Sequence, residues 1–417
     1  MSVLRNLEEV HFKGFLLGEL ASAIMGEILA SKTRLRALGM EACNDGFAPL
    51  LMALNASGSK CELRDLCFAM KYDEPSQMPT CDRSIQAISQ FVSLEALTLV
   101  LFGAEYALTY YPVPAELFAP LSALTQLRSL SIREEYHDYE RLGDFSSILM
   151  HLQGLQHLSL PRLPSRPELA VLPETLESLV DTGIRDGRDV HHLCDSLIDI
   201  ATHIRRHPKL RNIHCHALNL EAGPAGDYAA LPQALSALSH VHLTVENVRW
   251  VDDLDDLLNF FYHAQSLVKS VVQIEFLAEF GRDSEANFAS LAELCPTLTC
   301  IKVHTGLPCD APQWDPACIF GARWLRSLKE LRLALTGDIL DAGDLGQCSH
   351  ALLSLAIAMS AKEGPPLTMV IEGRACHEKQ SVDADIGLLH QQWASMSKAL
   401  KCLDCNQGHV HLQIELA

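Results

Sequence analysis

Histidine recurs at one place in two consecutive stretches of the chain. His214 and His242 each occupy the fifth position of a segment that opens with an apolar residue. If these segments are neighbouring strands of a parallel sheet, a strand spacing of about 4.8 Å brings the two imidazoles together. Paired imidazoles could bind a transition metal, form a pH-sensitive contact patch, or belong to a solvated polar face. All three interpretations stay open here.

A second group with chemical potential lies near the C-terminus. Cys402 and Cys405 are followed by His409 and His411. Two cysteines and two histidines are zinc ligands, and the cysteines alone could form a redox pair. The spacing is too short for a zinc finger, and the alternating apolar residues of 410–416 predict a terminal strand instead.

Sequence motifs of catalysis are missing. The chain has no glycine-rich phosphate loop of the Walker type and no Gly-x-Ser-x-Gly elbow, and its Ser, His and Asp residues show no catalytic spacing. We therefore expect a protein that is not an enzyme, with no cofactor and no bound metal.

The elements that would position these residues repeat along the chain. The pattern Leu-x-x-Leu-x-Leu recurs, with Leu7, Leu35 and Leu63 spaced 28 residues apart. The expected leading residues are Leu7, Leu35, Leu63, Leu94, Leu127, Leu155, Leu176, Leu210, Leu238, Val271, Leu298, Leu328 and Leu367. A repeated period of this length predicts stacked supersecondary units.

Helical patterns fill the intervals between these segments. The ranges with apolar residues at helical spacing are 16–30, 189–206, 253–263, 284–294, 348–361 and 384–400. One strand–helix unit cannot bury its apolar face alone, but stacked units can, with a parallel sheet inside and helices outside. The first, fourth and sixth residues would then face the core, and the third and fifth would face the open, concave side.

Composition limits the class of protein. The chain has 417 residues, 48% hydrophobic, and a formal charge of -19. Nucleic-acid binding usually needs a basic stripe, and the short basic cluster at Arg205–Arg206 has acids nearby in the sequence, so no nucleic-acid partner is expected. No secretory signal or membrane span is visible, and the 14 cysteines scatter without pairing, which favours a cytoplasmic location, with the nucleus also open.

The periodic segments from Leu7 to Leu416 resemble the leucine-rich repeat superfamily, in the long-unit style of ribonuclease inhibitor and F-box leucine-rich repeat proteins. The resemblance implies one α/β solenoid over 1–417, a horseshoe with a parallel concave sheet and outer helices. The family places Asn or Cys at the ninth position. Cys43 fits this, but Phe102 and Glu135 do not, so irregular turns are expected.

The start of the chain departs from the F-box pattern. The first strand is expected within a few residues of Met1, with neither an F-box segment nor a capping unit ahead of it. An uncapped strand would expose a sheet edge. We therefore expect a fragment or a divergent product that lacks an N-terminal part.

Three segments interrupt the repeats, near 103–120, 133–144 and 305–322, and are expected to be irregular loops. Together with the concave face they suggest a scaffold that binds another protein, in the most specific form a substrate-recognition module of the ubiquitin-ligase-receptor type. The expected contact residues are His214, His242, Glu275, Lys302 and Arg332 at the fifth position, with Tyr110 and Trp314 from the loops.

Another class of function stays open. Some leucine-rich repeat proteins of this unit length activate small GTPases by positioning the partner's own catalytic groups. A degenerate protein with no retained partner is a third alternative. No residue of the sequence decides between them.

Overall fold

The computed structural model describes most of the chain. The described residues are 7–12, 19–32, 34–40, 47–56, 62–71, 78–102, 114–135, 143–182, 190–220, 231–250, 254–277, 285–306, 326–339, 365, 367–375 and 410–416. The predicted helices at 348–361 and 384–400 lie outside them, as do Cys402, Cys405 and His409.

Strands and helices alternate along these residues. The strands are β1 (Glu9–Phe12), β2 (Ala37–Met40), β3 (Asp65–Lys71), β4 (Ala96–Phe102), β5 (Ser129–Glu135), β6 (His157–Leu160), β7 (Ser178–Asp181), β8 (Asn212–Leu220), β9 (His242–Trp250), β10 (Gln273–Leu277), β11 (Cys300–Gly306), β12 (Glu330–Ile339), β13 (Leu367–Ala375) and β14 (Val410–Leu416). The helices are α1 (Glu19–Ala30), α2 (Phe47–Ala56), α3 (Met78–Ser89), α4 (Ser146–Leu149), α5 (Arg166–Val171), α6 (Val190–His203), α7 (Leu231–Ala237), α8 (Leu254–His263), α9 (Gln265–Val268) and α10 (Glu285–Leu294), with 3₁₀ helices η3 (Ala115–Ala123) and η5 (Ile204–Arg206).

The chain divides into two compact units. The first comprises residues 1–188, 192–217 and 233–243, and the second comprises 189–191, 218–232 and 244–417. In the first unit β1 to β8 are parallel and each pairs with the next strand in the chain. In the second unit, residues 244–250 of β9 and the strands β10 to β14 do the same. The predicted α/β architecture of parallel strands in chain order is therefore confirmed, whereas the single solenoid over 1–417 stays a prediction.

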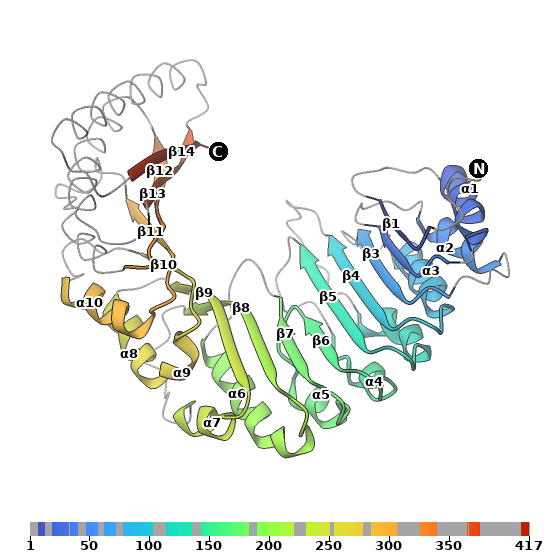
Figure 1. Cartoon of the computed structure of the whole chain (residues 1–417), viewed down its shortest axis with the longest axis horizontal. Helices are drawn as coiled ribbons and strands as arrows, with labels where there is room; N and C mark the ends of the chain where they lie inside the picture. Colours follow the sequence, from blue (N-terminus) through green and yellow to red (C-terminus); the bar gives the residue numbers. More distant parts are fainter. Residues whose placement is uncertain are drawn as a thin grey trace. The chain divides into compact units, whose positions relative to one another are not determined.

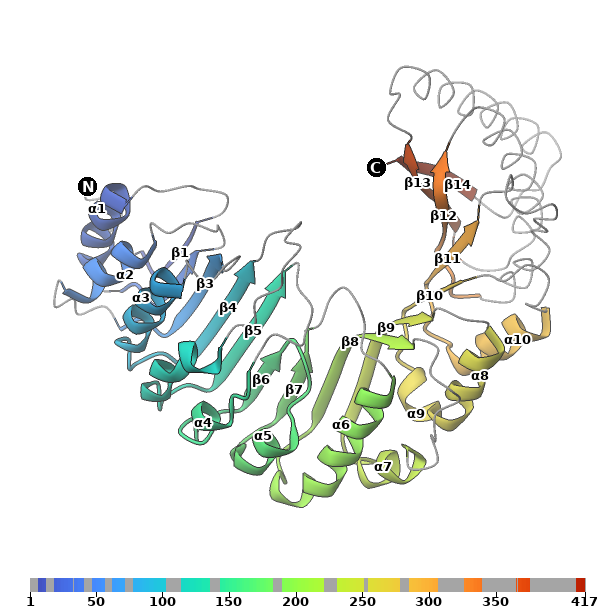
Figure 2. The ribbon, with the colours of Figure 1, turned by 180° about the vertical axis from the view of Figure 1, so that it is seen from behind.

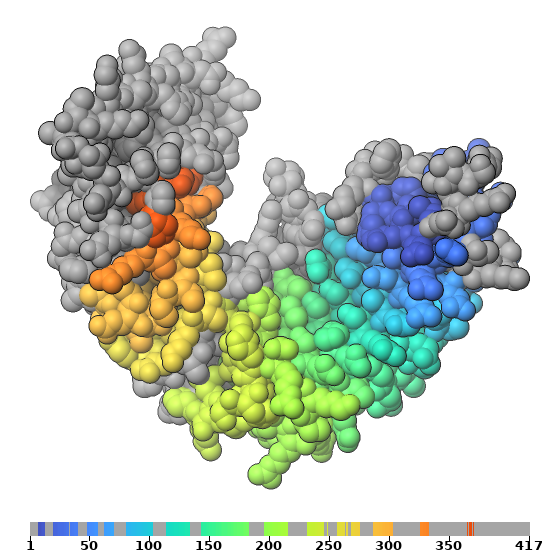
Figure 3. All heavy atoms as spheres, in the orientation of Figure 1, coloured from blue at the N-terminus to red at the C-terminus, as the bar shows by residue number. Residues whose placement is uncertain are grey.

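Within each unit the described helices lie on one face of the sheet, and none of them lies on the other, which we call the open face (Figures 1 and 2). Most leading residues are buried, among them Leu35, Leu94 and Leu127 of the first unit and Leu298 of the second, while Leu7 is partly exposed. Full burial of a leucine side chain contributes about 1.5–3 kcal/mol, so this spine drives the stacking. In the space-filling view, the helices and strands of successive repeats in the first unit pack closely (Figure 3).

A hydroxyl group joins many successive repeats. The residue just before the leading position donates a side-chain hydrogen bond to the leading carbonyl of the previous repeat. The bonds are Ser93 to Leu63 (3.0 Å), Thr175 to Leu155 (2.7 Å), Ser270 to Val245 (3.4 Å), Thr297 to Val271 (2.8 Å) and Ser327 to Leu298 (2.6 Å). These bonds satisfy backbone acceptors at the turns. These bonds were not predicted from the sequence, although a Ser or Thr before the leading residue is the signal for them.

The repeat that contains β9 does not begin at the expected leading residue, Leu238. We call the position of the leading residue along a strand the repeat phase, and this phase changes within β9. In the repeat before it, Arg211 donates its backbone N–H to the Glu177 carbonyl (2.9 Å). In β9 the residue that makes the equivalent bond, to the Arg211 carbonyl, is His242 (2.7 Å), so the leading residue is Val241 rather than Leu238. Leu238 is buried, but it extends the helical turn of α7. Its spacing to the next apolar residues imitates the strand pattern.

Toward β10, the leading residue of β9 lies further along the chain. Val248 pairs with Ile274 of β10, and Ser270 donates to the carbonyl of Val245, which sets Val245 as the leading residue for that neighbour. The two phases differ by four residues, the distance from Val241 to Val245.

The expected irregular loops are only partly described. Residues 115–120 of the segment 103–120 belong to the helix η3, so this part is not a loop as expected. Burial of Leu117 and Phe118 stabilises the helix there. Arg133–Glu135 complete β5, and Thr305–Gly306 complete β11. The rest of the three segments, apart from Pro114, Gly143 and Asp144, lies outside the described residues.

Candidate functional site

The open face of the second unit presents a row of charged side chains. Glu275 on β10 pairs in register with Lys302 on β11, and Lys302 pairs with Arg332 on β12. All three are partly exposed, while the residues just before them, Ile274 and Ile301 among others, are buried. The expected fifth positions therefore lie side by side on the face that the helices leave open.

Opposite charges meet within this row. The Lys302 Nζ atom lies 4.0 Å from Glu275 Oε1, and both side chains are about one-fifth exposed, at 22% and 19%. Arg332 forms an ion pair with Glu330 on its own strand. The row thus contains basic side chains that each lie beside an acidic one. Such a pattern suits recognition of a partner by the positions of its charges rather than by its net charge.

The thiol beside this row is not poised for chemistry. Cys300 Sγ lies 3.9 Å from Glu330 Oε1. Burial, and next the negative charge of Glu330, raise the pKa of the Cys300 thiol to about 11. Burial also raises the pKa of Cys295, to about 12. Because the thiolate is the nucleophile and metal ligand, neither cysteine has the electrostatics of a reactive group.

The two expected histidines do not share a register position. His214 on β8 is partly exposed and pairs with Val180 of β7. His242 is exposed and bonds through its backbone to Arg211, three residues before His214. The phase change in β9 causes this offset. The expectation that the two imidazoles lie side by side at one register position is therefore wrong.

Two of the expected contact residues and one histidine of the C-terminal Cys/His group remain. Tyr110 and Trp314 lie outside the described residues. His411 is in β14, where it pairs with Thr368 of β13.

Acidic groups and a histidine meet on the open face at β1 to β3. His11 Nε2 lies 2.5 Å from Glu9 Oε1. The imidazole lies over Gly39, where a Cβ atom would come within 2.1 Å of His11 Nδ1, so a larger residue at position 39 would displace the imidazole. Burial and the negative charge of Glu9 raise the pKa of Asp65, while His11 lowers it. These residues were not predicted as a site from the sequence.

Neither a cluster of metal-ligand residues nor a membrane-spanning helix is found in the described part of the chain. There, no three His, Cys, Asp or Glu side chains come together as a metal site would require. Over the same residues, no helix has the length and apolar character needed to cross a membrane.

Four exposed cations in η5 and in the turn that leads into β8 form a surface that we call the basic edge: Arg205, Arg206, Lys209 and Arg211. From the sequence, Arg205 and Arg206 were expected to be balanced by nearby acids. Among the described residues, however, no acidic side chain forms an ion pair with any of the four. The run from His203 to Arg211 was the signal in the sequence, because it contains no acid.

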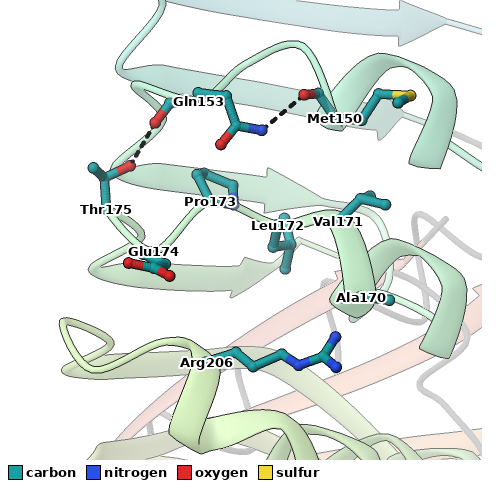
Figure 4. Close-up of a pocket in the computed structure, with 9 residues that line it drawn as sticks. All are labelled: Met150, Gln153, Ala170, Val171, Leu172, Pro173, Glu174, Thr175 and Arg206. Carbon is teal, nitrogen blue, oxygen red and sulfur yellow. Dashed lines mark hydrogen bonds between the residues drawn. The ribbon is translucent and has the colours of Figure 1, made fainter.

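A pocket of ≈ 720 Å³ adjoins the basic edge (Figure 4). Its lining residues are Met150, Gln153, Ala170, Val171, Leu172, Pro173, Glu174, Thr175 and Arg206. The guanidinium of Arg206 points from η5 toward the end of α5. Gln153 donates to the Met150 carbonyl (2.7 Å), and Thr175 donates to the Gln153 carbonyl (3.0 Å), so hydrogen bonds hold one wall in place.

A buried histidine fixes the turn that carries the basic edge. The His207 ring is 2% exposed, and its Nε2 lies 3.2 Å from the Leu169 carbonyl oxygen. Burial lowers the pKa of His207, and the neighbouring His203 and Arg206 lower it further, against backbone hydrogen bonds that raise it. His207 is therefore a neutral structural group, which keeps Arg206 and Lys209 on the surface.

Compared with known proteins, the chain matches no family model, and no curated protein matches it.

Proposed function

We propose that the chain is a leucine-rich repeat protein, a curved horseshoe solenoid that binds another protein along the open face of its sheet and has no catalytic role. One observation carries the proposal: Glu275, Lys302 and Arg332 lie in one register row on consecutive strands of that face. Rigid strands present these charges at fixed spacing, so a partner can be recognised without ordering a flexible surface.

The more specific form of the proposal is a substrate-recognition module of the ubiquitin-ligase-receptor type in the cytoplasm or nucleus. It rests on the repeat resemblance. Activation of a small GTPase is the alternative, and a turnover assay with a panel of small GTPases tests it. Acceleration of hydrolysis would replace the scaffold proposal.

A charge swap tests the open face. The variant Glu275→Lys/Lys302→Glu keeps the net charge and the opposite charges of the 4.0 Å pair, but reverses the pattern that a partner meets. We expect affinity capture from cell lysate to lose a specific protein with this variant. Binding of that protein, once purified, should be lost in direct titration as well.

The matched control is Glu293→Lys/Lys269→Glu, which swaps two exposed charges from α10 and from the turn after α9 in the same unit. It should capture and bind the partner as the wild type does. Equal loss with both variants, or no loss with the open-face swap, would contradict the proposed surface.

A further inference from the structure

The basic edge stands on a rigid turn. Leu210 is buried and donates its backbone N–H to the His207 carbonyl (3.1 Å), and His207 is itself held in the interior by the Leu169 carbonyl. Arg211 then joins the sheet through its bond to Glu177. The backbone of the four cations is therefore fixed before any partner binds, which lowers the entropy cost of association.

The next repeat extends this surface with imidazoles. Lys209 and His240 each precede a leading residue, and Arg211 and His242 each follow one. The bond from His242 N to the Arg211 carbonyl brings the second pair onto adjacent strands, about 4.8 Å apart. Both histidines are exposed, so they add hydrogen-bonding groups beside the cations.

One equivalent position in an earlier repeat carries a cation that neighbouring acids satisfy. Arg64, the counterpart of Arg211 just before β3, lies 3.0 Å from Glu95 and 3.7 Å from Glu62. At the basic edge the cations have no such partners among the described residues, in a chain whose net charge is -19. An exposed cluster of one sign within an oppositely charged chain favours binding of an oppositely charged ligand.

The adjoining pocket adds an apolar requirement. Val171, Leu172 and Pro173 line it beside Arg206, and Met150, which is 51% exposed, forms another part of the wall. Glu174 is the acid in the lining. A ligand that fits both features carries negative charge next to an apolar side chain.

We propose that the basic edge and the pocket together bind an acidic segment of a partner protein that carries an apolar residue beside its carboxylates. The carboxylates pair with Arg206, Lys209 and Arg211, and the apolar side chain enters the pocket. A nucleic acid fits less well, because it offers no aliphatic group for the pocket and the chain as a whole repels a long polyanion. The open face of the second unit takes no part in this binding. The experiments on the basic edge and the pocket therefore test this proposal separately from the proposed function.

Fluorescence anisotropy on the full chain tests this. The probe is a short labelled peptide of glutamates with one central leucine, compared with the same peptide carrying serine in place of leucine. Lys209→Glu/Arg211→Glu should weaken binding about tenfold or more, and added salt should weaken wild-type binding. Met150→Ser should reduce the advantage of the leucine peptide over the serine peptide.

The matched control is Arg34→Glu/Arg36→Glu, which reverses exposed cations at the same two repeat positions before and after Leu35. It should bind the peptide as the wild type does. Equal weakening by both double variants would overturn the proposal, because the attraction would then be general. So would a single-stranded oligonucleotide that displaces the peptide at lower concentration, or equal affinity for the leucine and serine peptides.

Discussion

Two arginine-containing regions of the first unit use their charges in opposite ways. Around Arg162, which we call the clasp, every charged group is satisfied internally. Its guanidinium forms a bidentate pair with Glu168 (2.5 and 2.6 Å) and also donates to the Gly143 carbonyl (3.2 Å). Glu168 is fully buried and accepts further bonds from Phe145 N (2.9 Å) and from Ser165 N (2.7 Å).

The basic edge has the reverse arrangement, with exposed cations and a buried neutral histidine beneath them. The difference shows which charges maintain the fold and which are available to a partner. A buried charge must have its partners inside the protein because it has lost its hydration. An exposed cation stays hydrated, so it costs little free energy when it has no protein partner. Changes in the clasp should therefore affect stability, and changes in the basic edge should affect binding.

The largest effect on stability is expected from Glu168→Ala. The substitution leaves the Arg162 charge and two backbone N–H groups without their acceptor in the interior, and breaking a buried pair in this way costs about 3–5 kcal/mol. Urea unfolding followed by circular dichroism measures the loss. Hydrogen exchange should locate it in peptides that cover 143–172.

Arg166→Ala provides the control for the clasp. Arg166 also pairs with a carboxylate, Asp199 at 2.6 Å, but its side chain is 73% exposed. Loss of such a pair should cost under about 1 kcal/mol. Unfolding of both variants at the same urea concentration would contradict the expectation that the buried pair contributes more to stability than the exposed pair.

His207 is expected to make the stability of the turn depend on pH. Its pKa is lowered in the folded protein, so below the ordinary value of 6.5 the unfolded chain binds a proton that the folded chain does not. Its contribution is present above pH 6.5 and is lost as the pH falls toward the lowered pKa. Hydrogen exchange of peptides over 200–211 should therefore speed up in that range, after correction for intrinsic rates.

In His207→Gln this pH dependence should disappear, even if the variant is less stable overall. His151→Gln, at an exposed position of the same unit, should keep the wild-type profile. A variant of His207 that retained the full pH dependence would show that another group is responsible.

The parallel architecture was predictable because leucines at fixed spacing report burial directly. Leu35, Leu94 and Leu298 lead strands as expected, and the row of Glu275, Lys302 and Arg332 follows from their spacing. The error at Leu238 has a physical cause: a leucine that ends a helix and one that starts a strand are both buried. Spacing alone cannot separate them.

The charge pairing in the clasp, and its absence among the described residues at the basic edge, were harder to predict from the sequence. Whether Arg206 meets an acid depends on residues brought together by the repeat, such as Glu174, and not on neighbours in the chain. Likewise Glu168 looks like an ordinary helix-start carboxylate until its pairing with Arg162 is seen. Pairing between side chains on different turns is a tertiary property, and local patterns do not encode it.

A smaller effect is expected from the hydroxyl bonds between repeats. Thr297→Val keeps the shape of the side chain but removes the hydroxyl that lies 2.8 Å from both the Val271 and the Lys269 carbonyl oxygens, which should cost about 0.5–1.5 kcal/mol. Thr299→Val is the control, since its bond to the Val272 carbonyl is long (3.4 Å) and exposed. Urea unfolding of the two variants should rank them in this order, and the reverse order would remove the hydroxyl from the account of stacking.

The smallest effect is expected where exposed charges satisfy one another. Arg64 is 47% exposed and Glu95 38% exposed, so their 3.0 Å pair should contribute about 0.2–1 kcal/mol. A double-mutant cycle of Arg64→Ala and Glu95→Ala measures this coupling directly. Neither substitution should change binding of the acidic leucine peptide. A clear loss of that binding would mean that cations with internal partners also serve as contacts, and the contrast with Lys209 and Arg211 would no longer hold.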